Sequence, residues 1–357
     1  LFCTLDNERS DSMATVARDR VHRTLTKVCI GVFLAVVLSG LGADSAFSQT
    51  TWPKKQWRRA DPSEQGMDPS VLDALHKRIR RGEFGYIDEM VVIRNGHLVF
   101  DETYQNDYVG ANADRNPSPD QYNYYNPNWH PFYHGTDLHT MQSITKSITA
   151  AVVGIAVERG DLPGVDAQAL AKPVAAAGVG QDATLQEVQI TNLVPDWSEL
   201  GGEPVDEYAR EYLFRPLGIK KYYWKTTPSG VPDTDGGLYL TAEDLARIGY
   251  LYLNDGKWNG TQILPEGWVQ ATAHSTDDAN WPSDSEDDDD PGYHWWLVPY
   301  RGSGPSHLLA ADGYGGQFLF VVPEKNLIAV FTGWNIYAPV PSIKDAFVNY
   351  VLRAVVR

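Results

Sequence analysis

Strand-like segments lie near both ends of this chain, and helix-like segments lie between them. Residues 87–92 and 97–104 are rich in β-branched and aromatic side chains, and Asn95-Gly96 between them is a strong hairpin signal. Residues 317–322 and 327–332 repeat the strand pattern near the other end of the chain. We therefore expect an α+β fold in which one antiparallel sheet is assembled from both chain ends.

The expected helices are marked by apolar residues at helical spacing and by capping residues. Asp68 before Pro69 and Thr241 before Glu243 are N-cap signals. Helices near the chain ends are expected to flank the sheet, and those at about residues 147–260 to form an inserted helical subdomain. The helical patterns cover residues 68–81, 147–157, 205–214, 241–254, 265–273 and 342–354.

The composition limits the fold and the partners. A chain of 357 residues with 43% hydrophobic content can form one large domain or two closely packed subdomains. Its formal net charge of -16 would repel nucleic acid or an anionic membrane surface, so a small neutral or cationic substrate is favoured. The acidic run at residues 286–290 is interpreted as a solvated loop rather than a calcium site. The sequence leaves the oligomeric state open.

The first 48 residues have the features of a leader with an export signal. Met13 is the expected start, a basic stretch precedes an apolar segment at residues 28–41, and Ala46-Phe47-Ser48 offers a cleavage site. The apolar segment is short for a bilayer, and a retained membrane anchor is the alternative. We therefore expect a periplasmic or secreted domain over residues 49–357. Both cysteines belong to the leader, so this domain would have no disulfide and no thiolate nucleophile.

Ser143 and Lys146 lie just before an uncharged run of small and apolar residues, 147–157, which predicts a buried helix. Residues three apart on a helix are neighbours, so the serine hydroxyl and the lysine amine can come within hydrogen-bond reach. A serine nucleophile needs a partner to accept its proton, and a buried lysine can do so. The N-terminus of a helix also favours an oxyanion. Ser143 and Lys146 are thus the candidate nucleophile and base. The alternative is a surface pair at the start of a helix.

Residues 105–138 form a long loop rich in Tyr, Trp, Asn and Pro. Such a loop is expected to be packed, either as the wall of a substrate pocket with Tyr133 as a contact, or simply against the core. His130 and His134 lie four apart, but Pro131 disfavours the helix that a metal site of this spacing needs. We therefore expect no metal and no organic cofactor.

Taken together, five stretches of the chain resemble the serine β-lactamase-like family. This family includes class C β-lactamases, D-alanyl-D-alanine carboxypeptidases, esterases and 6-aminohexanoate-dimer hydrolases. The resemblance implies a β-lactamase/transpeptidase-like fold, and it covers most of the expected mature chain. The matching stretches are residues 90–96, 141–157, 209–219, 236–254 and 312–324.

The resemblance implies roles for individual residues. Ser143 would be acylated, Lys146 would accept its proton, and the N–H groups of Ser143 and Tyr314 would form the oxyanion hole. The family's Lys-Thr-Gly motif corresponds here to residues 311–317, for which a Gly-rich hairpin bend is the alternative. No cation replaces the family's lysine there, which favours an uncharged ester or linear amide over penicillin. The implied substrate contacts in this motif are Gly313, Gly315, Gly316 and Gln317.

The family's middle motif contains a tyrosine that relays a proton to the leaving group, and this chain has no tyrosine between Lys146 and Gly202. The resemblance therefore implies a fold that is shortened in the middle. Either the sequence is incomplete or internally deleted, or another phenol takes the role, from residues 122–133 or from Tyr222 and Tyr223. The remaining candidates, Tyr208 and Tyr212, are interpreted as packing residues.

These observations predict an exported serine hydrolase that cleaves an ester or linear amide through an acyl-enzyme. One alternative is a catalytically impaired relative that recognises penicillin or binds the cell wall. Another alternative is a true β-lactamase. The expected partner is a small-molecule substrate, with membrane contact only through an uncleaved leader.

Overall fold

The structure is a computed structural model, and the chain divides into two compact units, residues 1–49 and 50–357. Only the second unit contains described residues. The expected leader and the acidic run at 286–290 lie outside them. Within the described part, no helix has the length and apolar character needed to cross a membrane. The described residues are 50–115, 118–161, 204–228, 230–275, 295–299, 307–337 and 339–356.

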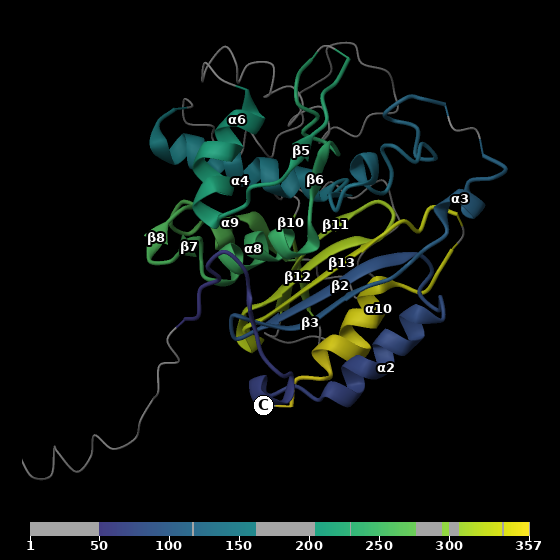
Figure 1. Ribbon diagram of the computed structural model, residues 1–357. Coiled ribbons are helices and arrows are strands. Elements are labelled where there is room, and N and C mark those ends of the chain that lie inside the picture. Colours follow the sequence, from purple (N-terminus) through teal and green to yellow (C-terminus); the bar gives the residue numbers. More distant parts are fainter. Residues whose placement is uncertain are drawn as a thin grey trace, which may run out of the picture. The chain divides into compact units, whose positions relative to one another are not determined.

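An eight-stranded sheet forms the centre of the unit (Figure 1), with the order β1-β3-β2-β13-β12-β11-β10-β9. The N-terminal hairpin β2–β3 pairs with the C-terminal strand β13 in antiparallel register, so both ends of the chain contribute to one sheet, as predicted. The α+β fold class is thus confirmed. Two short edge pairings, β1 with β3 and β9 with β10, are parallel and were not predicted. The strand bounds are β1 (Arg58–Arg59), β2 (Ile87–Arg94), β3 (His97–Thr103), β9 (Ala273–Ser275), β10 (Trp295–Pro299), β11 (His307–Gly313), β12 (Gln317–Val322) and β13 (Leu327–Gly333).

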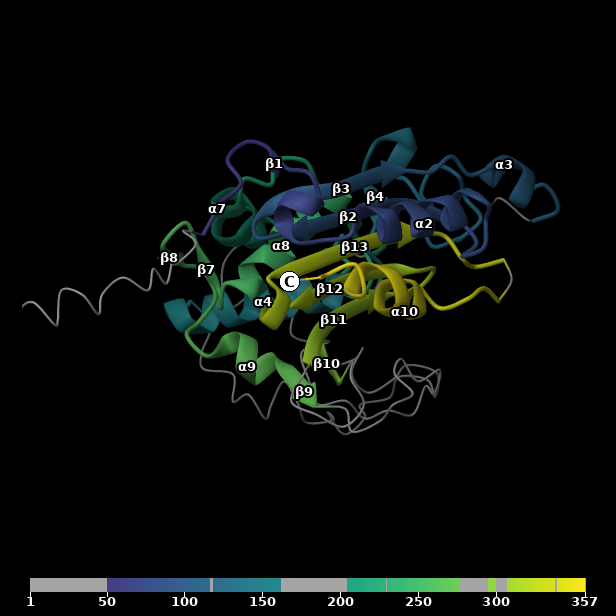
Figure 2. The same cartoon turned by 90° about the horizontal axis from the view of Figure 1, so that it is seen from below.

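Helices cover both faces of this sheet (Figure 2). On one face, α2 (Pro69–Arg80), α10 (Ile343–Ala346) and the π-helical continuation η5 (Phe347–Leu352) pack together. On the other face lie α4 (Ile144–Arg159) and α8 (Ala242–Leu253). Strand β2 is buried on both sides, because Val91 and Ile93 point into the core with α4 while Met90 and Val92 point into the core with α2.

Shorter elements lie in the connections between these strands and helices. Strands β4 (His139–Thr140), β6 (Leu238–Leu240) and β5 (Tyr223–Trp224) form a small antiparallel sheet, in which β4 precedes α4 in the chain while β5 and β6 follow it. The predicted helix at 205–214 runs on through α7 and ends at Gly218. The remaining bounds are η1 (Ser63–Gln65), α3 (Tyr108–Ala111), η2 (Tyr133–Gly135), α6 (Val205–Ala209), η3 (Arg210–Phe214), α7 (Arg215–Leu217), β7 (Lys257–Trp258), β8 (Thr261–Gln262), α9 (Trp268–Thr272) and η4 (Pro323–Lys325).

The predicted helix caps are present. The Asp68 carboxylate accepts a hydrogen bond from the Ser70 N–H at the start of α2, and the Thr241 hydroxyl accepts one from the Asp244 N–H at the start of α8. Each cap satisfies a backbone donor that the helix cannot pair internally. Gly160 ends α4 with φ of 76°, a conformation that favours glycine.

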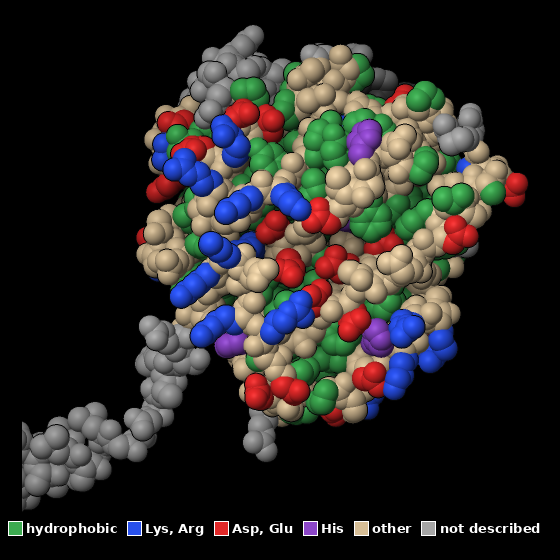
Figure 3. Space-filling model, in the orientation of Figure 1, with side chains coloured by type: hydrophobic (Ala, Val, Ile, Leu, Met, Phe, Trp, Pro, Cys, Tyr) green, Lys and Arg blue, Asp and Glu red, His purple; other side chains and the backbone are tan. Residues whose placement is uncertain are grey.

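Glu89 on β2 is largely enclosed beside other carboxylates. Burial raises the pKa of Glu89 to about 7, and the charges of Asp101 and Glu243 add to the shift. Acidic side chains gather in the middle of the face shown in Figure 3. Because the folded protein favours protonated Glu89, the free energy of unfolding should fall as the pH rises from 4.5, the usual value for this group, to about 7.

We expect Glu89→Gln to stabilise the protein at pH 8, because the variant carries no charge at this buried position. The gain in the free energy of unfolding should be about 1 to 3 kcal/mol at pH 8 and should become small near pH 4. Urea denaturation at both pH values measures it, with the exposed Glu266→Gln as the control. A gain of equal size at both pH values would contradict the assignment of the effect to the charge of Glu89.

Candidate active site

The predicted nucleophile and base meet at the start of α4. Ser143 is the N-cap residue of this helix, and Lys146 lies on its first turn. The Nζ atom of Lys146 lies 3.5 Å from the Ser143 Oγ atom. The lysine is buried, as is every other residue from Ile144 to Ala156. Lys146 is therefore buried and Ser143 is half-buried, so the pair does not face bulk solvent.

The backbone turns sharply just before the nucleophile. Gln142 is buried and has φ of 48°, a conformation that is uncommon for a residue with a side chain. Its side-chain amide donates to the Thr140 hydroxyl at 2.8 Å, which helps to hold the turn. Strand β4 thus leads into α4 through a fixed bend, and Ser143 lies directly after that bend.

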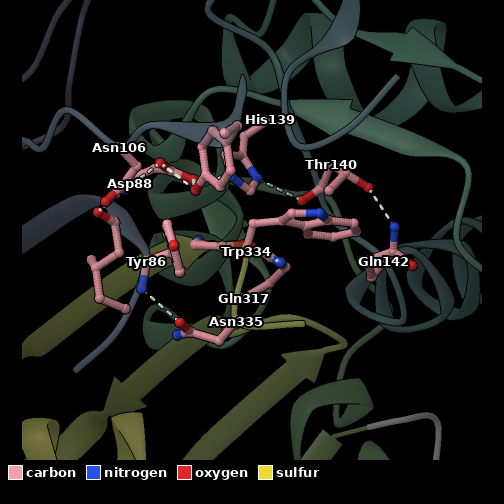
Figure 4. A network of polar contacts seen from close by, with 12 residues as sticks. Tyr86, Asp88, Asn106, His139, Thr140, Gln142, Gln317, Trp334 and Asn335 are labelled. Carbon is pink, nitrogen blue, oxygen red and sulfur yellow. Dashed lines mark hydrogen bonds and ion pairs between the residues drawn. The ribbon is translucent and has the colours of Figure 1, made fainter. Parts of the chain in front are cut away.

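Strand β4 is tied to the large sheet by a buried polar network (Figure 4). The carboxylate of Asp88 on β2 accepts hydrogen bonds from Asn106 at 2.8 Å and from the Tyr108 hydroxyl at 2.8 Å, and it faces His139 Nε2 at 3.0 Å. The other ring nitrogen of His139 faces the Thr140 carbonyl oxygen at 2.9 Å. Both ring nitrogens of His139 thus face oxygen atoms, one on β2 and one on β4 itself. Sequence analysis did not identify this network.

Asp235 is a second functional candidate that sequence analysis missed. Its Oδ1 atom forms an ion pair with Lys146 Nζ at 2.6 Å. The charge of Lys146 also affects the pKa of a further carboxylate, Asp312 on β11. Burial raises the pKa of Asp312, and this effect is opposed by a hydrogen bond from Trp296 and by the lysine. The acidic, Gly-rich stretch at residues 233–237 was the available signal, because a carboxylate in a tight turn is a common partner for a buried cation.

Asp233 fixes the turn that carries Asp235. Its Oδ1 atom accepts hydrogen bonds from the N–H groups of Asp235 and Gly236, both at 3.1 Å. Its Oδ2 atom lies 3.4 Å from the ammonium group of Lys225, which is buried. Burial lowers the pKa of Lys225, and Asp233 opposes the shift. The Lys225 ammonium also lies 4.1 Å from the centre of the Tyr122 ring.

The turn between β11 and β12 lies against the start of α4. A Cβ atom at Gly313 would lie only 2.4 Å from the Met141 carbonyl oxygen and 3.1 Å from Gln142 Cβ, so β11 passes within contact of the residues before Ser143. Gly315 and Gly316 have φ of 90° and 103° and form the turn that includes Tyr314. The structure thus places the neighbours of Ser143 and Tyr314, the two residues that the resemblance assigned to the oxyanion hole, in contact with one another from distant parts of the chain.

Gln317 differs from its expected role as a substrate contact. It is fully buried, and its amide donates to the carbonyl oxygens of Tyr314 at 2.9 Å and Gly333 at 2.8 Å. The amide oxygen accepts a hydrogen bond from the Gly333 N–H at 3.1 Å. These bonds occupy the side chain, so Gln317 positions the β11–β12 turn rather than a substrate.

The aromatic loop at residues 105–138 is packed, and the tyrosines considered as proton donors or substrate contacts differ in what they touch. Tyr133, expected as a substrate contact, stacks on Tyr223 with ring centroids 3.8 Å apart. Tyr222 packs against Phe214. The pKa of Tyr122 is raised to about 12 by burial and by nearby carboxylates, and Tyr122 differs from the other phenols because these carboxylates include Asp235, the partner of Lys146. Of these phenols, Tyr122 is therefore the one that a carboxylate links to Ser143 and Lys146, because Asp235 acts on Tyr122 and is paired with Lys146.

Two expected packing residues and the two loop histidines also have defined contacts. The Tyr208 hydroxyl donates to Asp161 at 2.6 Å, and Tyr212 packs on Tyr208. His130 stacks on Trp334, and burial lowers the pKa of His130 to about 3, while His134 packs edge-on against Trp129. Within the described residues, no group of three or more His, Cys, Asp or Glu side chains could hold a metal ion.

A family model described as Beta-lactamase matches residues 197–333 of the chain. This part of the chain is therefore similar to the Beta-lactamase family. The match contains β11 and the Gly313 turn, and it begins after Ser143 and Lys146. A curated relative from Alkalihalophilus pseudofirmus, described as an uncharacterized protein, is 29% identical over 208 residues. The alignment covers 49% of this chain and 58% of that relative, so the chain spans less than two thirds of its length.

Solved structures share the fold at low sequence identity. A proposed 6-aminohexanoate-dimer hydrolase from Bacillus anthracis has a TM-score of 0.53 and 15% identity, with 78% of this chain and 81% of that chain covered. A family VIII carboxylesterase has a TM-score of 0.53 and 13% identity, with 84% of this chain and 99% of that chain covered. At this identity the similarity establishes the fold alone.

Proposed function

We propose that the protein is an exported serine hydrolase that cleaves an ester or a linear amide through an acyl-enzyme on Ser143. The observation that supports this most strongly is the 3.5 Å separation between Ser143 Oγ and Lys146 Nζ at a buried helix start, with β11 packed alongside. Family members with this fold include hydrolases of several substrate classes, which supports a hydrolase in general.

In the proposed acylation step, Lys146 in its amine form accepts the proton of Ser143 as the oxygen attacks the carbonyl carbon. The ammonium form of Lys146 must first release its proton to solvent, and its ion-pair partner Asp235 has a side chain that is 41% exposed. The N–H groups of Ser143 and Tyr314 would hold the oxyanion, which is the largest charge formed in the transition state.

Tyr122 is our candidate proton donor for the leaving group. Its raised pKa keeps the phenol protonated at neutral pH, as a donor requires, and the Lys225 ammonium next to its ring would stabilise a transient phenolate. In deacylation the phenolate would take a proton from water, the resulting hydroxide would attack the ester, and Ser143 would recover its proton from Lys146. Each proton is thus returned at the end of the cycle.

An uncharged substrate is favoured over a β-lactam. The carboxylate of a β-lactam needs a cation on the strand beside the nucleophile, and here Asp312-Gly313-Tyr314 occupies that strand. The buried Lys225 is covered by the Tyr122 ring and paired with Asp233, so its charge is already balanced.

The nucleophile can be tested with a fluorophosphonate probe, which labels activated serines. We expect the wild-type protein and Ser147→Ala to be labelled, and Ser143→Ala to remain unlabelled, because only Ser143 lies beside Lys146 Nζ. Intact mass spectrometry measures the adduct. Labelling of Ser143→Ala to the wild-type extent would refute the assignment.

The proton donor can be tested with two esters that differ in their leaving group. We expect Tyr122→Phe to slow hydrolysis of ethyl acetate by about 10²- to 10⁴-fold, because ethoxide needs a proton to leave. Hydrolysis of p-nitrophenyl acetate should change far less, since nitrophenolate leaves without one. Equal effects on both esters would exclude Tyr122 as the donor.

The second candidate, a catalytically impaired relative, is favoured by the missing tyrosine motif in the middle of the chain. It predicts stoichiometric acylation by p-nitrophenyl acetate without release, whereas the hydrolase predicts repeated turnover. Nitrocefin hydrolysis distinguishes a third candidate, a true β-lactamase, from the other two, because only a true β-lactamase would hydrolyse this substrate efficiently.

A further inference from the structure

Three exposed aromatic rings lie beside the candidate site. Within the described residues, the exposed aromatic side chains are Tyr314 at 53%, Tyr122 at 42% and Tyr124 at 39%. Tyr314 follows Gly313, the residue in contact with Met141, and Tyr124 packs against the Tyr314 ring with centroids 5.2 Å apart. Exposed apolar surface that gathers at one place commonly marks a binding site.

Buried aromatic rings pack against Tyr124 and Tyr314. Trp334 is fully buried, its indole N–H donates to the Tyr124 carbonyl oxygen at 3.2 Å, and its ring meets both tyrosines edge-on. His130 stacks on Trp334 and also meets Tyr124 edge-on at 5.4 Å. A Cβ atom at Gly315 would lie 2.8 Å from the Trp334 ring, so the turn that contains Tyr314 also packs against Trp334. The two tyrosine rings are therefore fixed in place while part of each remains exposed.

The charges near these rings disfavour an anionic ligand. Burial lowers the pKa of His130 to about 3, so this ring is neutral at physiological pH. The neighbouring Tyr122 lies in the field of three carboxylates, which are Asp233, Asp120 and Asp235. The faces of tyrosine rings are themselves electron-rich. An uncharged ring fits this surface better than a carboxylate or a phosphate does.

We propose that Tyr124 and Tyr314 form an aromatic subsite that binds an uncharged aromatic ring of the substrate. This inference rests on the proposed hydrolase function, because the ring would be carried by the ester or amide that Ser143 attacks. The subsite selects substrates that present an aryl group close to the scissile bond. Stacked or edge-to-face contacts with fixed rings supply the selectivity.

The test uses pairs of esters of almost equal reactivity that differ only in the ring. Ethyl 3-phenylpropanoate and ethyl 3-cyclohexylpropanoate place the ring on the acyl side. The acetates of 2-phenylethanol and 2-cyclohexylethanol place it on the alcohol side. For one of the two pairs, we expect the wild-type protein to show a kcat/KM that is about three- to tenfold higher for the aromatic member, mainly through a lower KM.

Variants identify the rings that carry the preference. Tyr124→Leu and Tyr314→Leu are each expected to bring the aromatic-to-saturated ratio of kcat/KM close to one, whereas Tyr124→Phe and Tyr314→Phe retain it. Tyr212→Leu is the matched control, because Tyr212 packs on Arg159 at the other end of the 16-residue helix α4, about 24 Å along its axis from Ser143. This control should keep the wild-type ratio.

Each outcome has a separate meaning for the two proposals. Ester hydrolysis that depends on Ser143 but shows no preference within either pair would overturn the aromatic subsite and leave the hydrolase intact. A preference for the saturated ring, or a ratio unchanged in both leucine variants, would also overturn the subsite. Loss of the hydrolase itself would be seen separately, as fluorophosphonate labelling that does not require Ser143.

Discussion

The site depends on the close contact between strand β11 and the start of helix α4. Gly313 approaches the Met141 carbonyl so closely that a Cβ atom would lie at 2.4 Å, and only glycine avoids this overlap. Ser143 and Lys146 come from the inserted helical part, whereas Tyr314 comes from the C-terminal part of the sheet. Without this contact, the nucleophile and the proposed second oxyanion donor would belong to separate parts of the molecule.

Two groups of polar contacts hold the segments that lie next to the start of α4. Asp88 and His139 tie strand β4 to the large sheet, and Asp233 shapes the turn from which Asp235 reaches Lys146. Buried polar groups of this kind are costly when a partner is lost, by about 1 to 3 kcal/mol for each unsatisfied group. Such networks favour a single arrangement of the backbone around Ser143, which is what catalysis by fixed groups requires.

The sequence was informative where the signal was local. The Asn95-Gly96 hairpin, the capped helices and the pairing of a serine with a lysine three residues later all follow from spacing along the chain. The roles of Asp88, Asp235 and Gln317 could not be predicted, because each depends on a partner that is distant in sequence or on the backbone of another strand. The parallel edge strands were also missed, since pairings of two and three residues leave almost no pattern.

The central claim is that one oxyanion site is formed by backbone donors from two distant segments. A crystal structure of the fluorophosphonate adduct tests this most directly. The account predicts a phosphonyl oxygen about 2.7 to 3.1 Å from both the Ser143 and the Tyr314 backbone nitrogen atoms. An adduct on Ser143 whose phosphonyl oxygens all lie away from the Tyr314 nitrogen would contradict it.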